Sequence, residues 1–373
     1  MEKHPNIELF KSGDDDFAWA ERSEYWRKRN SKHGRDRRKK FNYRQPLILC
    51  GHGVRLRVDH GTLLVRNGFT HYPQEQEEIR FFPGDPNLPD RIVVLDSSGS
   101  LTLDALAWLS DQQITLVQLN WRGEINVIGG VTGHSAKRNL VEAQLAAQHG
   151  TRRIKIARWL ISDKIAASID TLQKTLPKSD EREFVEGHLE NCLKKISRIV
   201  DTAPLARLSG IEGTAAAVYF RLWHGLPLRW SNVKRKPIPE SWQRIGPRKM
   251  GWRDNSRNAR HPVNAMLNYG YGMLASQVRI QTVAAGLDPS IGIMHGNKDN
   301  RIPLVYDLME PLRPVVDQAI FEFALEHTFS PGDFAFNRWG GCRLNPQMAK
   351  VVASRLTAIS DNRVINTFLK QLR

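Results

Sequence analysis

Cysteine is scarce in this sequence. The 373 residues include three, Cys50, Cys192 and Cys342, which are far apart and odd in number. This pattern fits buried free thiols in a reducing cytoplasm rather than a disulfide framework. Because the sequence has no Cys-x-x-Cys pair, it also argues against a structural zinc site.

Long apolar runs and acidic residues are also in short supply. No run approaches the roughly 18–20 apolar residues that cross a bilayer, and residues 1–16 are polar and partly acidic, unlike a signal peptide. Asp and Glu number 39 against 55 Lys and Arg, which gives a formal net charge of +16. Such an excess favours a polyanionic partner, either nucleic acid or an anionic membrane surface. Without other membrane features, nucleic acid is the better interpretation and no membrane association is expected.

The chain length predicts two domains, at roughly 100–200 residues each, preceded by a basic extension of residues 1–45. Residues 27–44 contain ten Lys or Arg and one acid. Such a run is typical of a solvated arm that is mobile without a partner. Trp19, Tyr25 and Trp26 indicate a short helix that docks just before it.

Residues 46–133 are predicted to form a small β-rich domain. Residues 54–58 alternate apolar and polar side chains, as a half-buried strand does, and Asn67-Gly68 is typical of a hairpin turn. Further strands are predicted at residues 63–65, 79–82, 91–95, 114–117 and 124–128, with a short helix at 101–109.

Residues 134–373 are predicted to form a larger all-α domain, because apolar residues recur there at three- and four-residue spacing. The predicted helices are residues 140–147, 154–172, 181–200, 204–223, 262–285 and from 305 onward, with an irregular stretch at 225–262. The expected fold class is therefore α+β, with a small β-rich domain, a hinge and a larger helical domain.

Glu212 stands in a predicted helix of otherwise small and apolar residues. A carboxylate in such a setting is partly desolvated and needs a cation. The cation could be a metal ion or a neighbouring arginine such as Arg207, and taken alone the sequence favours the arginine.

A second set of polar residues lies further along the chain. His295 follows a loop marked by Gly and Pro, where a lone His is either structural or a ligand. Asp307 and Glu310 are three residues apart and share a face if their segment is helical. They are either first-turn acids stabilised by the helix dipole or metal ligands.

Together, one His and these carboxylates can bind a divalent cation. Carboxylates suit Mg²⁺ and Mn²⁺, and the imidazole shifts the preference slightly toward Mn²⁺. Such a metal polarises a phosphodiester and activates an attacking hydroxyl. A basic chain with this set is a candidate phosphodiester-transfer enzyme.

Residues 229–260 contain ten Lys or Arg against two acids, with Trp230, Trp242 and Trp252 interleaved. Cations hold phosphates, and indoles stack on bases. The predicted DNA-binding residues are Arg229, Arg248, Lys249, Trp252, Arg253 and Arg257. The alternative is a basic surface loop whose tryptophans pack into the core.

Four stretches, in this order, resemble those of the CRISPR adaptation integrase family, the larger of the two core spacer-acquisition proteins. They are Gly210-Ile-Glu212-Gly; Pro262-Val-Asn264-Ala-Met-Leu-Asn-Tyr269-Gly-Tyr271; Gly286-Leu-Asp-Pro289 leading to His295-Gly296; and Asp307-Leu-Met-Glu310-Pro-Leu-Arg313-Pro. The similarity in layout covers residues 46–330, and residues 1–45 are outside the family's common core.

The resemblance implies a DNA endonuclease and integrase that depends on Mg²⁺ or Mn²⁺ held by Glu212, His295 and Glu310, with Asp307 as a nearby accessory acid. It implies homodimers, two of which flank a dimer of a small ferredoxin-like subunit. The reaction it implies joins the 3′-hydroxyl of a double-stranded spacer precursor to each end of a CRISPR repeat by transesterification.

Two alternatives stay open. The chain could be a related integrase of a mobile element with the same catalytic domain. Such relatives often carry an added DNA-binding module, and no helix-turn-helix is visible after Pro314. It could also be a non-catalytic DNA-binding scaffold whose acids are structural.

Overall fold

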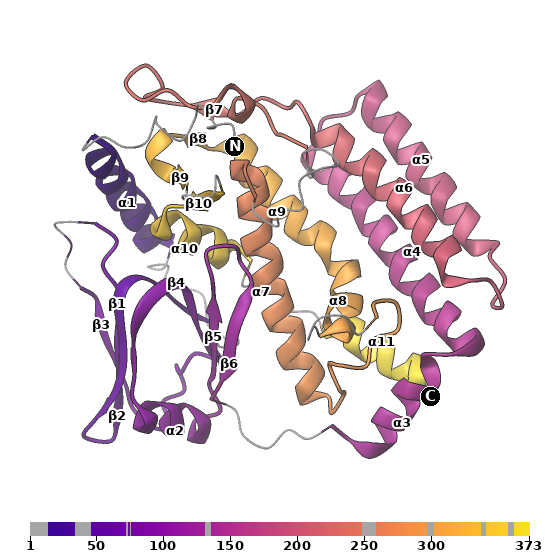
Figure 1. Cartoon of the computed structure of the whole chain (residues 1–373), viewed down its shortest axis with the longest axis horizontal. Coiled ribbons are helices and arrows are strands. Elements are labelled where there is room, and N and C mark those ends of the chain that lie inside the picture. Colours follow the sequence, from indigo (N-terminus) through magenta and orange to yellow (C-terminus); the bar gives the residue numbers. More distant parts are fainter. Residues whose placement is uncertain are drawn as a thin grey trace, which may run out of the picture.

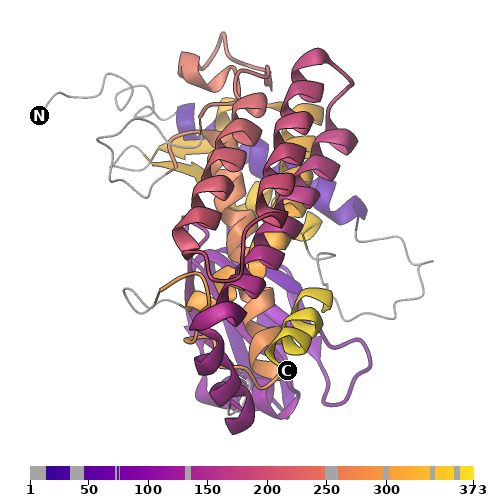
Figure 2. The same cartoon turned by 90° about the vertical axis from the view of Figure 1, so that its right-hand side faces the viewer.

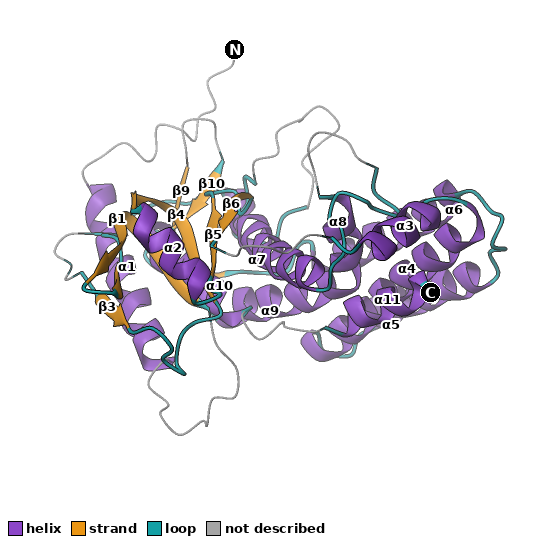
Figure 3. Cartoon of the chain, turned by 90° about the horizontal axis from the view of Figure 1, so that it is seen from below, coloured by secondary structure: helices purple, strands orange, loops and turns teal. Residues whose placement is uncertain are grey.

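The computed structural model describes residues 14–33, 46–71, 74, 76–130, 136–247, 259–296, 302–336, 341–356 and 362–373. Within these, a first helix is followed by a β-rich unit and then by a mostly helical one (Figures 1 and 3). The predicted α+β fold class is confirmed. None of the described helices is long and apolar enough to cross a membrane.

The β-rich unit is built on a six-stranded mixed sheet of order β3-β2-β1-β4-β5-β6. Its elements are β1 (Leu47–Asp59), β2 (Thr62–Arg66), β3 (Glu78–Phe81), β4 (Arg91–Leu101), α2 (Leu103–Asp111), β5 (Thr115–Leu119) and β6 (Ile125–Gly129). The neighbours β1, β4 and β5 run parallel, and α2 connects β4 to β5. Each predicted strand and the predicted helix is present.

Two cores lie on opposite faces of this sheet. They explain why β1 begins at Leu47, although the alternating pattern predicted a strand only from residue 54. Leu49 points into the core under α2, with Ile92 and Trp108. Ile48 and Cys50 point into the larger core on the other face. Because both faces are covered, residues 47–50 are apolar throughout, and the alternation expected of a half-buried strand starts only further along.

The mostly helical unit contains three long helices that lie side by side (Figures 1 and 2), α4 (Gly150–Thr175), α5 (Asp180–Ser197) and α6 (Leu205–Trp223). Its other helices are α3 (Arg138–Ala147), α7 (Pro262–Ala284), α8 (Pro303–Met309), α9 (Arg313–Glu326), α10 (Pro346–Arg355) and α11 (Arg363–Leu372), with the 3-10 turns η2 (Glu240–Trp242), η3 (Glu310–Leu312) and η4 (Pro331–Asp333). The unit is not purely α-helical, because β7 (Arg229–Trp230) pairs with β8 (Thr328–Phe329) and β9 (Phe334–Phe336) with β10 (Cys342–Leu344).

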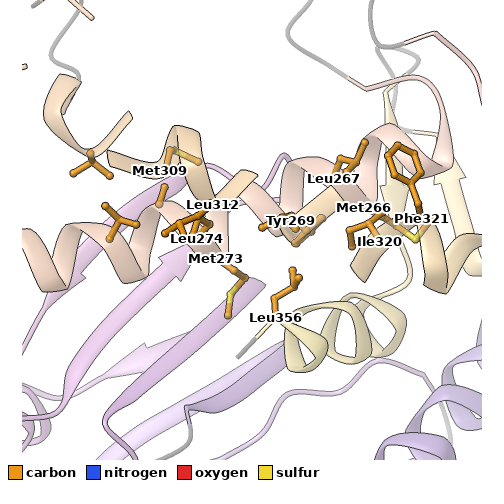
Figure 4. Close-up of a cluster of buried hydrophobic side chains, with 14 of the residues drawn as sticks. Met266, Leu267, Tyr269, Met273, Leu274, Met309, Leu312, Ile320, Phe321 and Leu356 are labelled. Carbon is orange, nitrogen blue, oxygen red and sulfur yellow. The ribbon is translucent and has the colours of Figure 1, made fainter. Parts of the chain in front are cut away.

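Helix α7 joins the two units. It crosses the turn between β5 and β6 at a pair of glycines: a Cβ on Gly272 would lie 1.8 Å from the carbonyl oxygen of Gly123, which itself has a φ of +80°. On the same helix, Met266, Tyr269 and Met273 belong to the cluster that Figure 4 shows, with side chains from α9 and from the segment around Met309. This packing fixes α7 between the sheet and the other helices.

Helix α1 (Asp14–His33) contains the predicted docking helix and extends into the basic run. Trp26 is fully buried, and its Nε1 donates to Asp333 Oδ1 at 2.6 Å. Arg22 donates to both Asp333 oxygens, from Nε at 2.7 Å and from Nη2 at 2.9 Å. Trp26 is therefore an internal anchor that ties α1 to the other end of the chain. Residues 34–45, the rest of the expected arm, are outside the described residues.

The three cysteines are buried and free, as predicted from their number and spacing. Burial raises the pKa of Cys50 to about 11. Such a thiol is protonated at neutral pH and behaves as a small apolar side chain.

Candidate active site

Two of the predicted site acids meet at one lysine. Glu212 lies on α6, Glu310 begins η3, and Lys164 of α4 reaches both. The Lys164 Nζ contacts Glu212 Oε1 and lies 2.7 Å from Glu310 Oε2. Two carboxylates that are about a hundred residues apart in the sequence therefore share the Lys164 ammonium. The partner of Glu212 is thus Lys164, not the neighbouring Arg207 that the sequence suggested.

This cluster is partly sheltered from solvent. The side chains of Glu310, Lys164 and Glu212 are 7%, 17% and 26% exposed. Burial opposes the charge on Lys164, yet Glu310 and Glu212 together raise its pKa above the ordinary value. Burial likewise acts against the Glu310 carboxylate, but Arg313 and Lys164 hold its pKa below the usual range. At neutral pH Lys164 and Glu310 are both charged, and each stabilises the charged form of the other.

A cleft of about 760 Å³ opens beside the cluster. Arg313 lines it, with its guanidinium 5.1 Å from the centre of the Tyr271 ring and its Nε 3.4 Å from Glu310 Oε1. The Tyr271 hydroxyl donates to Asp317 Oδ1. The small residues next to Glu212 leave this space open, since a Cβ on Gly213 would meet no atom within 4 Å. A ligand bound in this cleft could therefore contact carboxylates, cations and a tyrosine side chain.

His295 and Asp307 form a second pair. The Asp307 carboxylate belongs to α8 and is fully buried against the loop that carries His295. Its Oδ2 accepts from the backbone N–H of Ile293 at 2.5 Å and of Met294 at 3.0 Å. Its Oδ1 lies 2.6 Å from His295 Nδ1 and accepts the His295 backbone N–H at 3.0 Å. Both oxygens of Asp307 are thus used to hold the loop.

Because Nδ1 of His295 is bonded to Asp307, Nε2 is the ring nitrogen that could bind a ligand. The hydrogen bond with Asp307 raises the pKa of His295 against the opposing effect of burial, and the charge of Glu310 adds to the increase. In the neutral ring with Nδ1–H donating to the carboxylate, Nε2 would carry the lone pair that a metal ion requires, which is the common arrangement around histidine ligands. The side chain of His295 is 44% exposed, so it is not sealed inside the protein.

The predicted ligands Glu212, His295 and Glu310 have donor atoms that suit a divalent cation, but their side chains are not arranged around one point. In the part of the chain that the structure describes, no three His, Cys, Asp or Glu side chains are placed to hold a metal ion together. Glu212 and Glu310 do converge on one positive charge, and hard oxygen donors of this kind suit Mg²⁺ or Mn²⁺. With them, His295 Nε2 would complete the donor set.

The predicted DNA-binding residues fall into two groups. Arg229 has an exposed side chain whose Nη2 donates to the Leu325 carbonyl at 2.7 Å. The remaining five, Arg248, Lys249, Trp252, Arg253 and Arg257, are outside the described residues. Trp230 and Trp242, the tryptophans of this stretch that the structure describes, pack against the core, as the alternative expected. Trp242 is buried, and Trp230 donates its Nε1 hydrogen to the Trp242 carbonyl at 3.0 Å.

Sequence reasoning missed Lys164 and Asp317. The signal for Lys164 was present, because it continues the stripe of Ala157 and Ile161 at three- and four-residue spacing, where an apolar side chain would be expected. A charged residue on a buried stripe needs a partner of opposite charge.

The protein-family model described as CRISPR associated protein Cas1 matches residues 47–358. This chain belongs to the Cas1 family. A CRISPR-associated endonuclease Cas1 from Methanospirillum hungatei is 31% identical over 275 residues, 68% of this chain and 75% of that relative. The family places the protein among the endonucleases and integrases of CRISPR adaptation.

Solved structures share the fold. A casposase bound to integration product has a TM-score of 0.68 at 25% identity, and the match covers 84% of this Cas1 chain and 82% of the casposase. A Cas1 protein from Thermotoga maritima has a TM-score of 0.64 at 19% identity, covering 88% of this chain and 95% of its own. Helix α1 precedes the region that the Cas1 family model matches.

Proposed function

We propose that this Cas1 protein integrates spacer precursors into a CRISPR repeat by a metal-dependent transesterification, with Mg²⁺ or Mn²⁺ held by Glu212, His295 and Glu310. The observation that carries the proposal is the meeting of Glu212 and Glu310 at the Lys164 ammonium. Two carboxylates from separate helices that share one cation define a place where a doubly charged ion would be more strongly attracted.

The reaction exchanges one phosphodiester for another. The 3′-hydroxyl oxygen of the spacer precursor attacks a phosphorus at the repeat end, where a new P–O bond forms. The old bond from that phosphorus to the 3′-oxygen of the strand that flanks the repeat breaks, the repeat keeps the phosphorus through its 5′-oxygen, and the proton of the attacking hydroxyl ends on the released 3′-oxygen. A bound divalent cation would polarise the phosphodiester and stabilise the negative charge of the five-coordinate phosphorus.

The chain's own residues orient these groups. Asp307 holds the loop of His295 and fixes which imidazole nitrogen is free. We therefore propose that Asp307 acts mainly by positioning His295 rather than as a ligand in its own right. Arg313, paired with Glu310 at the wall of the cleft, is placed to attract a phosphate oxygen.

The partners follow from the same proposal. Double-stranded DNA, as spacer precursor and as repeat, would lie against the basic residues 229–260, where ten Lys or Arg outnumber two acids. The protein would act as a homodimer with a small ferredoxin-like adaptation subunit, in the cytoplasm where its DNA substrates are. We take residues 46–133 and 134–373 as its two domains.

A strand-transfer assay tests this function. The purified protein would be given a labelled spacer precursor and supercoiled plasmids with and without the repeat, in Mn²⁺, in Mg²⁺ and in EDTA. Label should enter the repeat-bearing plasmid only when a metal ion is present. A protein that binds DNA without transferring strands in any condition would be the non-catalytic scaffold.

The mobile-element integrase is the second candidate, and the similarity to a casposase favours it. The same assay separates the two. A CRISPR integrase inserts at the repeat ends, whereas an integrase of a mobile element would show no preference for the repeat-bearing plasmid.

A further inference from the structure

We propose that Lys164 is an exchangeable counter-cation: it holds Glu212 and Glu310 together in the metal-free protein and gives up its place when the divalent ion binds. This inference rests on the proposed metal site and adds a residue to it. Lys164 is a positioning residue in this scheme, since it acts on the ligands rather than on the substrate.

The geometry supports exchange rather than coexistence. The Lys164 ammonium uses one oxygen of each acid, Glu212 Oε1 and Glu310 Oε2. A metal ion that is bound by the same two side chains would stand next to a fixed positive charge in a sheltered setting, where like charges repel strongly. The ammonium and the ion therefore compete for the same carboxylates.

The metal-free protein needs such a cation. Glu212 and Glu310 approach the same point from α6 and η3, and Glu310 is almost fully buried. Without a positive charge between them, two carboxylates at one place would repel each other. Lys164 removes that repulsion, and so it keeps the ligands close together until a metal arrives.

The cleft gives the Lys164 side chain space to move into when it is displaced. Lys164 lines the cleft of about 760 Å³, together with Ser168 from the next turn of α4. Lysine carries its charge on a flexible four-carbon stem, so the ammonium can move several ångströms without a shift of the helix. The cleft is also where the DNA phosphate is proposed to lie, so a freed ammonium would remain near an anion.

The test compares Lys164→Met with Lys174→Met, a matched control on the same helix. Lys174 pairs with Asp170 on an exposed surface, so its loss removes a charge without touching the acids. Mn²⁺ binding is measured by titration calorimetry and metal-free stability by thermal unfolding in EDTA. Lys164→Met should bind Mn²⁺ about 5-fold more tightly or better, in the range of ordinary site coupling, and should melt lower in EDTA. The control should match the wild type.

Unchanged or weaker Mn²⁺ binding by Lys164→Met would overturn the exchange. If that variant does not fold in EDTA, brief acetylation of the wild type followed by peptide mass spectrometry decides the matter. Lys164 should be protected in EDTA and labelled once Mn²⁺ is added, whereas Lys174 should be labelled equally in both. Equal labelling of Lys164 with and without Mn²⁺ would reject exchange.

Glu212→Gln separates this inference from the function on which it rests. If the wild type binds Mn²⁺ no better than Glu212→Gln, the metal site itself is wrong, and the exchange is rejected with it. If Mn²⁺ binding depends on Glu212 but not on Lys164, only the exchange is rejected.

Discussion

Asp307 and His295 are joined twice, because the same Asp307 Oδ1 bonds the ring Nδ1 at 2.6 Å and the backbone N–H of His295 at 3.0 Å. The other oxygen holds the two preceding backbone N–H groups. One buried carboxylate therefore sets both the course of the loop and the direction of the imidazole. This role is distinct from that of Glu310, whose carboxylate faces Lys164.

The first prediction follows from that difference. Asp307→Asn replaces one of the two acceptor oxygens by an NH2 group, which donates and cannot accept, so the loop and the ring lose part of their support. Mn²⁺ affinity should fall about 10- to 100-fold, as it does for other residues that orient metal ligands. Glu310→Gln should remove Mn²⁺ binding and strand transfer altogether. Calorimetry on both variants that showed the reverse order would make Asp307 the principal ligand.

The second prediction concerns the attachment of α1. Arg22→Met would leave the buried Asp333 carboxylate without its cation, which typically costs about 3–5 kcal/mol of unfolding free energy. Arg27→Met is the control, because Arg27 pairs with Glu24 at the surface and should cost less than about 1 kcal/mol. Urea unfolding followed by circular dichroism measures both. Adding Asp333→Asn to Arg22→Met should recover part of the loss. Equal stability of the two single variants would mean that α1 is only loosely attached.

The third prediction concerns pH. Burial lowers the pKa of His261 to about 4 from an ordinary value of about 6.5. The ring is neutral in the fold, where Nδ1 accepts the N–H of Val263 at the start of α7 and Nε2 bonds the Arg244 carbonyl. Between pH 6.5 and 4 the unfolded chain takes up a proton that the folded chain does not, so stability falls as the pH falls through this window.

His261→Asn tests that assignment. Asparagine also accepts at a helix N-cap but does not titrate, so the variant should lose less stability than the wild type between pH 7 and pH 5. His327 leaves a residual slope, since burial lowers its pKa to about 4 as well. Thermal unfolding at a series of pH values measures the slope, and identical slopes would show that His261 takes up its proton at the same pH in the folded and the unfolded chain.

The fourth prediction concerns the basic stretch. Replacing Arg248, Lys249, Arg253 and Arg257 by glutamine should weaken DNA binding equally for all sequences. The slope of log K against log salt should become shallower by about 0.9 for each phosphate of duplex DNA that the variant no longer neutralises. Fluorescence anisotropy over a range of salt concentrations measures this slope. An unchanged slope would place the DNA elsewhere on the protein.

Periodicity was enough to predict most of the fold. The alternation at residues 54–58 and the three- and four-residue spacing at 154–172 correspond to β1 and α4, because burial on one face selects those patterns. The start of β1 was missed, since a strand buried on both faces has no alternation. The pairing of β9 with β10 was missed as well, because such short strands have too few residues to show a period.

The candidate site was predictable in part. The order of Glu212, His295 and Glu310 along the chain carried the resemblance to the family, and the structure brings the two glutamates together. The bond between Arg22 and Asp333 could not be foreseen, because nothing local in either segment identifies a partner more than 300 residues away. Lys164 was visible only as a charged residue on an apolar stripe, and that pattern indicates a partner without naming it.

We propose that Glu212 and Glu310 hold one and the same metal ion, and Mn²⁺ binding by single and double variants is the decisive measurement. Calorimetry would compare the wild type with Glu212→Gln, Glu310→Gln and the double variant, and a strand-transfer assay on the same samples would add His295→Ala. The wild type should bind one Mn²⁺ per chain, and either single variant should lose that ion. The double variant should show no further loss, and no variant should transfer strands. If Glu212→Gln kept a full Mn²⁺ site that only Glu310→Gln removed, the two acids would not share an ion, and the proposed metal site would be wrong.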